Sequence, residues 1–111
     1  MVTLTNVGTA YDAIAASKGL GFAFIDFTGV TSLRVRIKVN KVGTGTQSWQ
    51  VFNETDGTEI GVFNDAGAAG DRTFDQTFAV SLTGVKDVRV RCKSTVGTDD
   101  PVYYGASFFA T

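Results

Sequence analysis

One alternating pattern is written twice in the chain, and it restricts the fold more than any other feature. The stretches TGVTSLRVRIK (Thr28–Lys38) and TGVKDVRVRCK (Thr83–Lys93) begin 55 positions apart. In both, apolar residues alternate with arginine or lysine. A period of two predicts a half-buried β-strand with its apolar side chains inward and its basic side chains outward. A further match, Val42-Gly43-Thr44 against Val96-Gly97-Thr98, follows the two copies.

The same period recurs along most of the chain. Asp56-Gly57 is a strong hairpin signal, because both residues tolerate positive φ. With the two repeated strands, the pattern predicts seven or eight strands. The further ones are Leu4–Val7 with Ala10–Ala16, Phe22–Phe27, Ser48–Phe52, Thr58–Phe63, Phe74–Leu82 and Val102–Ala110. We therefore predict an all-β fold, a jelly-roll-like β-sandwich of about eight antiparallel strands with an internal pseudo-repeat.

The chain of 111 residues is expected to form a single domain over 1–111. Its N-terminal segment, 1–17, is apolar enough to need a surface but is weakly patterned. It either packs on its own subunit or reaches a neighbour as an extended arm. This segment lacks the charged start and apolar centre of a signal peptide, and no apolar run approaches the ~20 residues of a membrane span. We expect a protein made in the cytoplasm, with no membrane partner.

Composition argues against most kinds of catalysis. The chain has no histidine and one cysteine, so it lacks the commonest general base and metal ligand and cannot form an internal disulfide. Cys92 is expected to be a buried thiol. Two acidic clusters, Asn53 with Asp56 and Glu59, and Asp99-Asp100, are interpreted as turn residues and not as calcium ligands. We predict no catalytic, cofactor-binding or metal-binding residues.

The outward arginines are the first candidates for a functional surface. Two interpretations remain open. In the first, acidic residues on neighbouring strands or turns pair with the arginines, and the candidates are Asp26, Glu54, Glu59, Asp71 and Asp75. Alternatively, the planar guanidinium groups meet a protein partner, in which case the contact residues are Arg34, Arg36, Arg89 and Arg91. The net charge of −1 argues against a nucleic-acid partner.

Aromatic residues are the second candidates, for stacking on sugar rings. They are Trp49, Tyr103 and Tyr104. Tyr103 and Tyr104 are adjacent, so in a regular strand one points inward and the other outward. Trp49 is interpreted mainly as a core residue.

Two long stretches, FTGVTSLRVRIKVNKVGTGTQSWQVFNETDGTEIGVF and LTGVKDVRVRCKSTVGTDDPVYYGASF, together resemble a small β-sandwich module of tailed-bacteriophage virion proteins. The likeness includes the DFTG turn, the GTGTQ-W hairpin and the KSTVGTDDPV turn, and it covers about residues 10–110. The resemblance implies a non-catalytic structural protein of the virion, either a capsid decoration (cement) protein or a tail or fibre component.

That resemblance also sets the expected partners. They are further copies of the chain and capsid or tail proteins, in a homo-oligomer. A trimer is favoured, because cement proteins often occupy capsid three-fold positions. The alternative function is a carbohydrate-binding β-sandwich module.

Overall fold

The computed structural model describes residues 2–5, 7–14 and 23–111, which form nine strands and no helix. Seven strands have four residues or more, and two are shorter. The strands are β1 (Val2–Thr3), β2 (Asp12–Ile14), β3 (Ala23–Asp26), β4 (Ser32–Lys41), β5 (Gln47–Asn53), β6 (Thr58–Asp65), β7 (Gly70–Ala79), β8 (Val85–Ser94) and β9 (Val102–Ala110). The predicted all-β class is confirmed.

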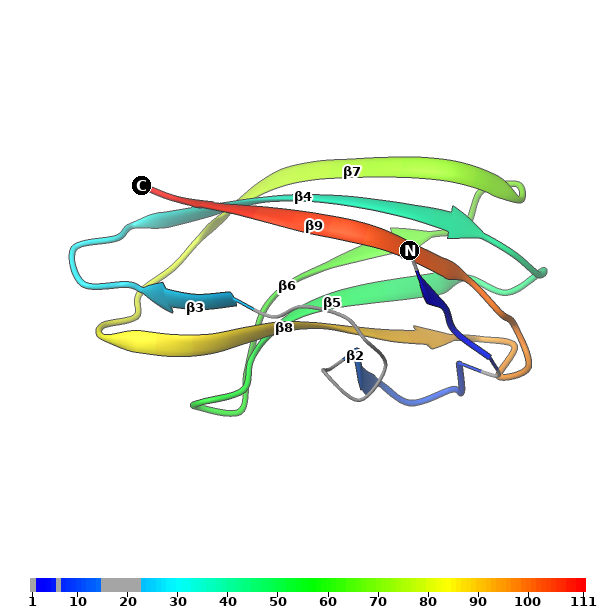
Figure 1. Ribbon diagram of the computed structural model, residues 1–111, viewed down its shortest axis with the longest axis horizontal. Helices are drawn as coiled ribbons and strands as arrows, with labels where there is room; N and C mark the ends of the chain where they lie inside the picture. Colours follow the sequence, from blue (N-terminus) through cyan, green and yellow to red (C-terminus); the bar gives the residue numbers. More distant parts are fainter. Residues whose placement is uncertain (1, 6, 15–22) are drawn as a thin grey trace.

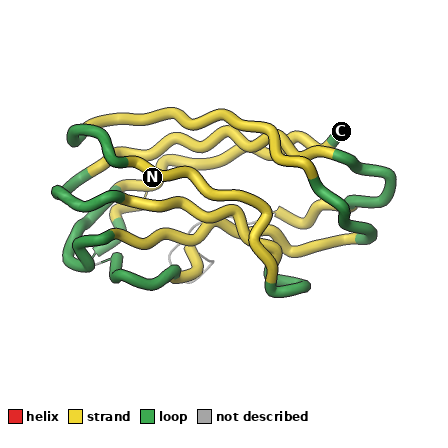
Figure 2. Tube along the Cα trace, turned by 180° about the vertical axis from the view of Figure 1, so that it is seen from behind, coloured by secondary structure: helices red, strands yellow, loops and turns green. Residues whose placement is uncertain are grey.

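The strands build two antiparallel sheets that face each other across the core (Figures 1 and 2). Sheet A has the order β1-β9-β4-β7. Sheet B has the order β2-β8-β5-β6, and β3 pairs with β8 beside β2. When β2 and β3 are counted as one strand position, the pairing is nested, so that the first strand of the chain pairs with the last, the second with the next to last, and so on inwards. The pairs are β1·β9, β2/β3·β8, β4·β7 and β5·β6.

The two copies of the repeat, β4 and β8, are central strands of opposite sheets. Leu33, Val35 and Ile37 of β4 are fully buried, and Val88, Val90 and Cys92 of β8 occupy the corresponding inward positions. Between the sheets, Trp49 stacks on Tyr103 with ring centroids 5.9 Å apart. Removing such side chains from water stabilises the fold by roughly 1.5–3 kcal/mol each. Burial of Cys92 is as predicted.

The turns that precede the two copies lie against each other. Gly29 and Gly84 both have left-handed φ, 77° and 80°. The Phe27 amide donates to the Gly84 carbonyl at 2.9 Å, and the Gly84 amide donates to Thr28 Oγ1 at 3.2 Å. The repeat therefore supplies each sheet with a central strand. The turns that lead into these two strands bind each other at the same end of the sandwich.

The described part of the N-terminal segment packs on its own chain. β1 pairs with β9, and the Leu4 amide donates to the Pro101 carbonyl at 2.8 Å. Leu4 and Val7 are buried in the core. The predicted strand at Leu4–Val7 was wrong, because this stretch binds the Val96–Pro101 turn region instead of a strand. Of the predicted Ala10–Ala16 strand, Asp12–Ile14 is β2, and residues 15–16 lie outside the described residues.

Strand ends differ from the prediction mainly at β7, which spans Gly70–Ala79 in place of Phe74–Leu82. Gly70 and Arg72 occupy the first two inward positions of β7, so the start of this strand lacks the alternation of apolar residues. The Asp-Gly hairpin between β5 and β6 is confirmed. Gly57 has φ 68°, and the Asn53 side chain bonds Asp56 within the turn.

Candidate functional site

The four predicted contact arginines do not form one surface. Arg34 and Arg36 project from β4 on the outer face of sheet A, whereas Arg89 and Arg91 project from β8 on the outer face of sheet B. The two basic strands are not paired with each other, because β4 lies between β7 and β9. Like-charge repulsion between the two basic strands therefore does not arise.

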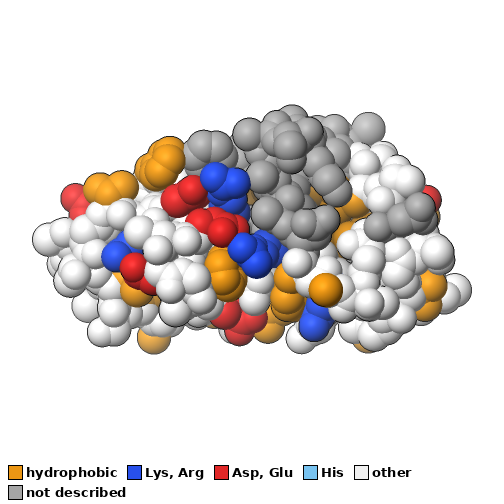
Figure 3. Space-filling model, turned by 90° about the horizontal axis from the view of Figure 1, so that it is seen from below, with side chains coloured by type: hydrophobic (Ala, Val, Ile, Leu, Met, Phe, Trp, Pro, Cys, Tyr) orange, Lys and Arg blue, Asp and Glu red, His pale blue; other side chains and the backbone are white. Residues whose placement is uncertain are grey.

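Acidic residues neutralise the arginines of sheet B. The Arg91 guanidinium makes three hydrogen bonds of 2.9–3.0 Å to Glu54 and lies 3.9 Å from the centroid of the Phe52 ring. Arg89 binds Asp87 at 3.0 Å. Acidic and basic side chains accordingly lie side by side in the view from below (Figure 3). For Arg91 the geometry matches the interpretation as a charge pair with an acid of a neighbouring turn. Arg89 pairs instead with Asp87 of its own strand, which was not among the candidate acids.

On sheet A, Arg34 is held in the same way. Its Nε and Nη2 donate to the two oxygens of Asp75 at 2.9 and 2.7 Å. These bonds from Arg34 hold the pKa of the Asp75 carboxyl below its usual value. Phe109 also lies beneath this guanidinium, with its centroid 5.6 Å from Arg34 Cζ. Arg34 thus has both an anionic and an aromatic neighbour within the chain.

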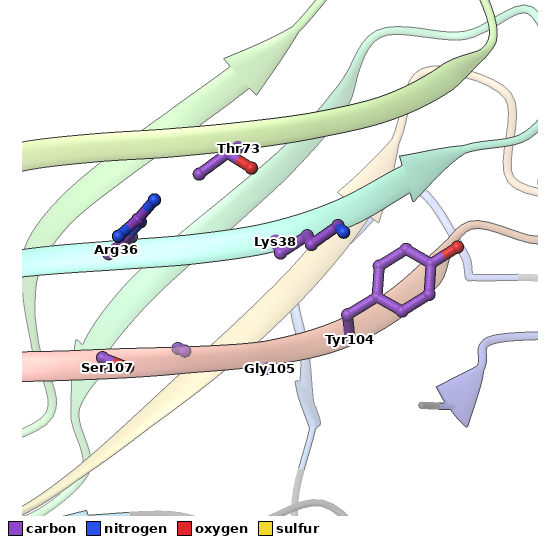
Figure 4. Close-up of a pocket in the computed structure, with 7 residues that line it drawn as sticks. Arg36, Lys38, Thr73, Tyr104, Gly105 and Ser107 are labelled. Atoms are coloured by element: carbon purple, nitrogen blue, oxygen red, sulfur yellow. The ribbon is translucent and has the colours of Figure 1, made fainter.

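Arg36 differs from the other three arginines, since no ion pair joins it to an acid within the described chain. Its register partner on β7 is Asp75, whose two oxygens both bind Arg34. Arg36 instead borders an open groove of about 520 Å³ on the outer face of sheet A (Figure 4). The lining residues are Arg36, Lys38, Thr73, Tyr104, Gly105, Ala106 and Ser107, and we call this site the sheet A groove.

A β-bulge in β9 shapes the sheet A groove. Lys38 pairs with Gly105 but Val39 pairs with Tyr103, so Tyr104 is an extra residue on β9. The extra residue reverses the alternation beyond it. Gly105 therefore lies on the outer face beside Tyr104, and its lack of a side chain leaves the floor of the groove low. No atom lies within 4 Å of a Cβ built on Gly105.

Tyr104 and Lys38 form the end wall of the sheet A groove. Lys38 Nζ lies 5.4 Å from the centroid of the Tyr104 ring, and Tyr104 Oη lies 3.2 Å from Asp71 Oδ1. Burial raises the pKa of the Tyr104 hydroxyl, and the bond to Asp71 adds to this. Bonds from Asn40 and Tyr104 lower the pKa of the Asp71 carboxyl. Asp71 is therefore anionic at neutral pH, but it lies outside the lining of the groove.

Two of the three candidate sugar-stacking residues are buried, which contradicts a stacking role and confirms the interpretation of Trp49 as a core residue. Trp49 is fully buried and Tyr103 is 6% exposed, so neither ring offers a face to a ligand. Burial raises the pKa of Tyr103 to about 12. Tyr104 is 36% exposed and is the one member of the set on the surface. The expected opposite orientation of the two adjacent tyrosines is confirmed.

The acidic residues near Asp99 form a structural site. Asp99 is buried and accepts hydrogen bonds from Ser94 Oγ at 2.8 Å, the Gly45 amide at 3.0 Å and Gln47 Nε2 at 3.4 Å. Burial alone raises its pKa, but these bonds outweigh burial and leave the pKa below its usual value. Within the described residues, no group of three His, Cys, Asp or Glu residues is arranged to hold a metal ion.

The outer edge of β9 is the second notable surface. β1 pairs only with Val102 and Tyr103, so the described chain leaves the edge uncovered from Tyr104 to Ala110. Ser32 and Thr111 exchange both backbone hydrogen bonds. Because bonded and non-bonded pairs alternate in antiparallel sheets, the amides of Ala106, Phe108 and Ala110 point to this uncovered edge.

Charge distinguishes β9 from the other edge strands. β9 has the sequence VYYGASFFA, without a charged residue or proline. The other long edge strands are interrupted by charge, at Asp71, Arg72 and Asp75 in β7 and at Glu59 and Asp65 in β6. Charges and proline are the usual protection of an edge against pairing with another chain. The β9 edge lacks both.

Sequence reasoning missed Thr73, Gly105 and Ser107 as groove residues. Their positions depend on which strands flank β4 and on the bulge at Tyr104, and neither follows from alternation. Lys38 was recognised as outward but not as a contact residue. The available signal was the Tyr-Gly pair before a small-residue run in β9, since glycine within a strand often marks a bulge.

Comparison with known proteins adds no family. No protein-family model, curated protein or solved structure matches the chain significantly. The described part of the chain also contains no helix with the length and hydrophobicity of a membrane span.

Proposed function

We propose that this protein is a non-catalytic structural component of a bacteriophage virion, a capsid decoration protein that works through protein–protein contacts. The observation that carries the proposal is the uncharged edge of β9, which the described residues leave uncovered from Tyr104 to Ala110. An edge of this kind binds an extended strand of a neighbouring chain through backbone hydrogen bonds. The virion location comes from the resemblance of the two arginine-strand stretches to phage sandwich modules.

The neighbour in this proposal is another copy of the chain, with capsid protein as the further partner. Symmetry restricts how copies can pair. If two β9 edges meet each other, the contact is isologous and closes as a dimer. A trimer, which the resemblance favours, requires that β9 of one copy meets a different surface of the next. The oligomeric state therefore reports which contact is made.

The arginines have a smaller part in the assembly than the sequence suggests. Arg34, Arg89 and Arg91 are engaged by acids of their own chain. Breaking those pairs to meet a partner would cost their existing hydrogen bonds. The assembly is therefore expected to persist in high salt, because backbone pairing and apolar contact at β9 are screened little.

Light scattering on a size-exclusion column tests the proposal. The wild-type protein is expected to elute as a dimer or trimer at low and at high salt. Ala106→Pro removes an amide that points to the uncovered edge of β9 and is expected to give a monomer. Thr77→Pro is the matched control, because its amide points to the outer edge of β7, which charged residues protect. A wild-type monomer under all conditions, or equal loss of mass in both variants, would contradict the proposal.

A further inference from the structure

We propose that the sheet A groove binds a carboxylated saccharide, a glycan segment that carries uronic or sialic acid residues. This inference goes beyond the proposed assembly function. It concerns the solvent-facing surface of sheet A, whereas assembly uses the edge of β9. It also assigns a ligand to the one predicted contact arginine that no acid of the described chain engages in an ion pair.

The first argument is the state of Arg36. A guanidinium with available N–H donors binds a carboxylate through two parallel hydrogen bonds. Arg36 lies opposite Asp75 on β7 and opposite Ser107 on β9. Asp75 is occupied, since both of its oxygens bind Arg34. Arg36 therefore presents a positive group at the border of the groove, and its neighbouring acid is already neutralised.

The second argument is the chemistry of the remaining lining. Lys38 adds a second positive charge, and Thr73 and Ser107 add hydroxyl groups from the strands on either side (Figure 4). No Asp or Glu is among the described residues that line the groove. A lining that is rich in donors suits a ligand that is rich in acceptors. A sugar acid supplies a carboxylate, a ring oxygen and several hydroxyl oxygens on one small unit.

The third argument is shape. A groove of about 520 Å³ is within the range of small-ligand sites, roughly 300–1,000 Å³. Its floor is low at Gly105 and Ala106, and its end is the partly exposed ring of Tyr104. An aromatic wall can contact the apolar face of a sugar ring. An acidic peptide side chain would engage Arg36 but would leave the Tyr104 wall and the two hydroxyls without a function, so the saccharide is the better fit.

Titration calorimetry and amide chemical shifts test this inference, with trigalacturonic acid as the acidic probe and galactotriose as the neutral one. Trigalacturonic acid is expected to bind and to shift the amides of Arg36, Thr73 and Ser107, while galactotriose binds at least about tenfold more weakly. Such a difference is what one charge-assisted pair contributes. Trp49 fluorescence is not a suitable readout, because the indole is fully buried.

Three variants make the test specific. Arg36→Gln is expected to weaken the binding of trigalacturonic acid at least about tenfold. Ser107→Phe places a ring in the groove at an exposed strand position and is expected to abolish binding. Arg91→Gln, which removes a similar charge from the opposite face, is expected to leave binding unchanged. Unperturbed shifts of the core amides establish that each variant is folded.

Several results would overturn the inference. They are equal affinity for the acidic and neutral trisaccharides, equal losses for Arg36→Gln and Arg91→Gln, or binding of pentaglutamate as tight as that of trigalacturonic acid. The last would assign the groove to an acidic protein segment. The assembly proposal is judged separately by native mass. A monomer that binds trigalacturonic acid upholds the groove and contradicts assembly, and an oligomer that does not bind it does the reverse.

Discussion

Replacing Asp99 with alanine tests the best-defined hydrogen-bond network around a buried carboxylate in this fold. The carboxylate joins the end of β8 to the turn before β5, through Ser94 Oγ at 2.8 Å and the Gly45 amide at 3.0 Å. A hydrogen bond to a charged group contributes about 1.5–3 kcal/mol net. Two such bonds give about 3–6 kcal/mol, and water can reach part of the turn once the side chain is gone. We expect a loss of about 3 kcal/mol, at the lower end of that range.

Urea unfolding followed by Trp49 fluorescence measures this loss, because Trp49 is buried only in the folded protein. A loss of about 3 kcal/mol corresponds to a melting temperature roughly 13 °C lower for a domain of this size. The control is Asp75→Asn, which breaks the exposed pair with Arg34 and is expected to change stability little. A loss below about 1 kcal/mol for Asp99→Ala would refute the reasoning. It would mean that the two hydrogen bonds to the Asp99 carboxylate together contribute no more to the free energy of unfolding than one ordinary hydrogen bond.

The pH dependence gives an independent check on Asp99. Its pKa is lowered in the folded state, so the unfolded chain binds more protons in the acidic range. The contribution of Asp99 is therefore present above the ordinary aspartate pKa of about 3.9 and is lost as the pH falls through the folded-state pKa. The stability difference between wild type and Asp99→Ala should shrink on acidification. A difference that stays constant from pH 7 to pH 2 would contradict this.

Four further substitutions test the core and the repeat, each by urea unfolding. Gly29→Ala and Gly84→Ala should each lower the free energy of unfolding by about 1–2 kcal/mol, because both sites have left-handed φ and no atom lies near the new Cβ. Clearly unequal losses would argue against equivalent roles for the two turns. Gly61→Ala should lose about 1–3 kcal/mol, since its Cβ would lie 2.2 Å from the Phe78 ring, and an unchanged midpoint would show that the ring moves freely. Tyr103 has a raised pKa of about 12, so stability should fall as the pH rises from about 10 towards 12, and Tyr103→Phe should lessen that fall.

Period-two alternation was sufficient to predict the strands whose central inward residues are apolar. β9 spans the predicted residues, β5 extends the predicted strand by one residue at each end, and β4 and β8 contain the alternating residues of the two copies. β7 was shifted, because Gly70 and Arg72 occupy inward positions and interrupt the pattern. Local turn chemistry was also readable, as the Asp56-Gly57 hairpin shows. These features depend on residues that are close together in the sequence, so they can be predicted from one sequence alone.

The pairing of strands could not be predicted, because alternation shows which face is inward but not which strand lies alongside. The Arg34 and Asp75 pair illustrates this, since the two residues are 41 positions apart and meet only through the β4–β7 register. The sheet A groove is a consequence of the same long-range register together with the bulge at Tyr104. For the same reason, Trp49, although interpreted mainly as a core residue, and Tyr103 stayed among the candidates for sugar stacking. Their burial depends on the stacking of one sheet on the other.

Amide hydrogen exchange along β9 at two protein concentrations tests the central claim most directly. The account predicts that the amides of Ala106, Phe108 and Ala110, which point to the uncovered edge, exchange rapidly in dilute protein and slowly when the protein is concentrated. The amide of Thr111, which donates to Ser32 within sheet A, should show no such dependence. Rapid exchange of the three edge amides at every concentration, in a protein whose native mass is that of one chain, would contradict the claim that β9 joins neighbouring copies.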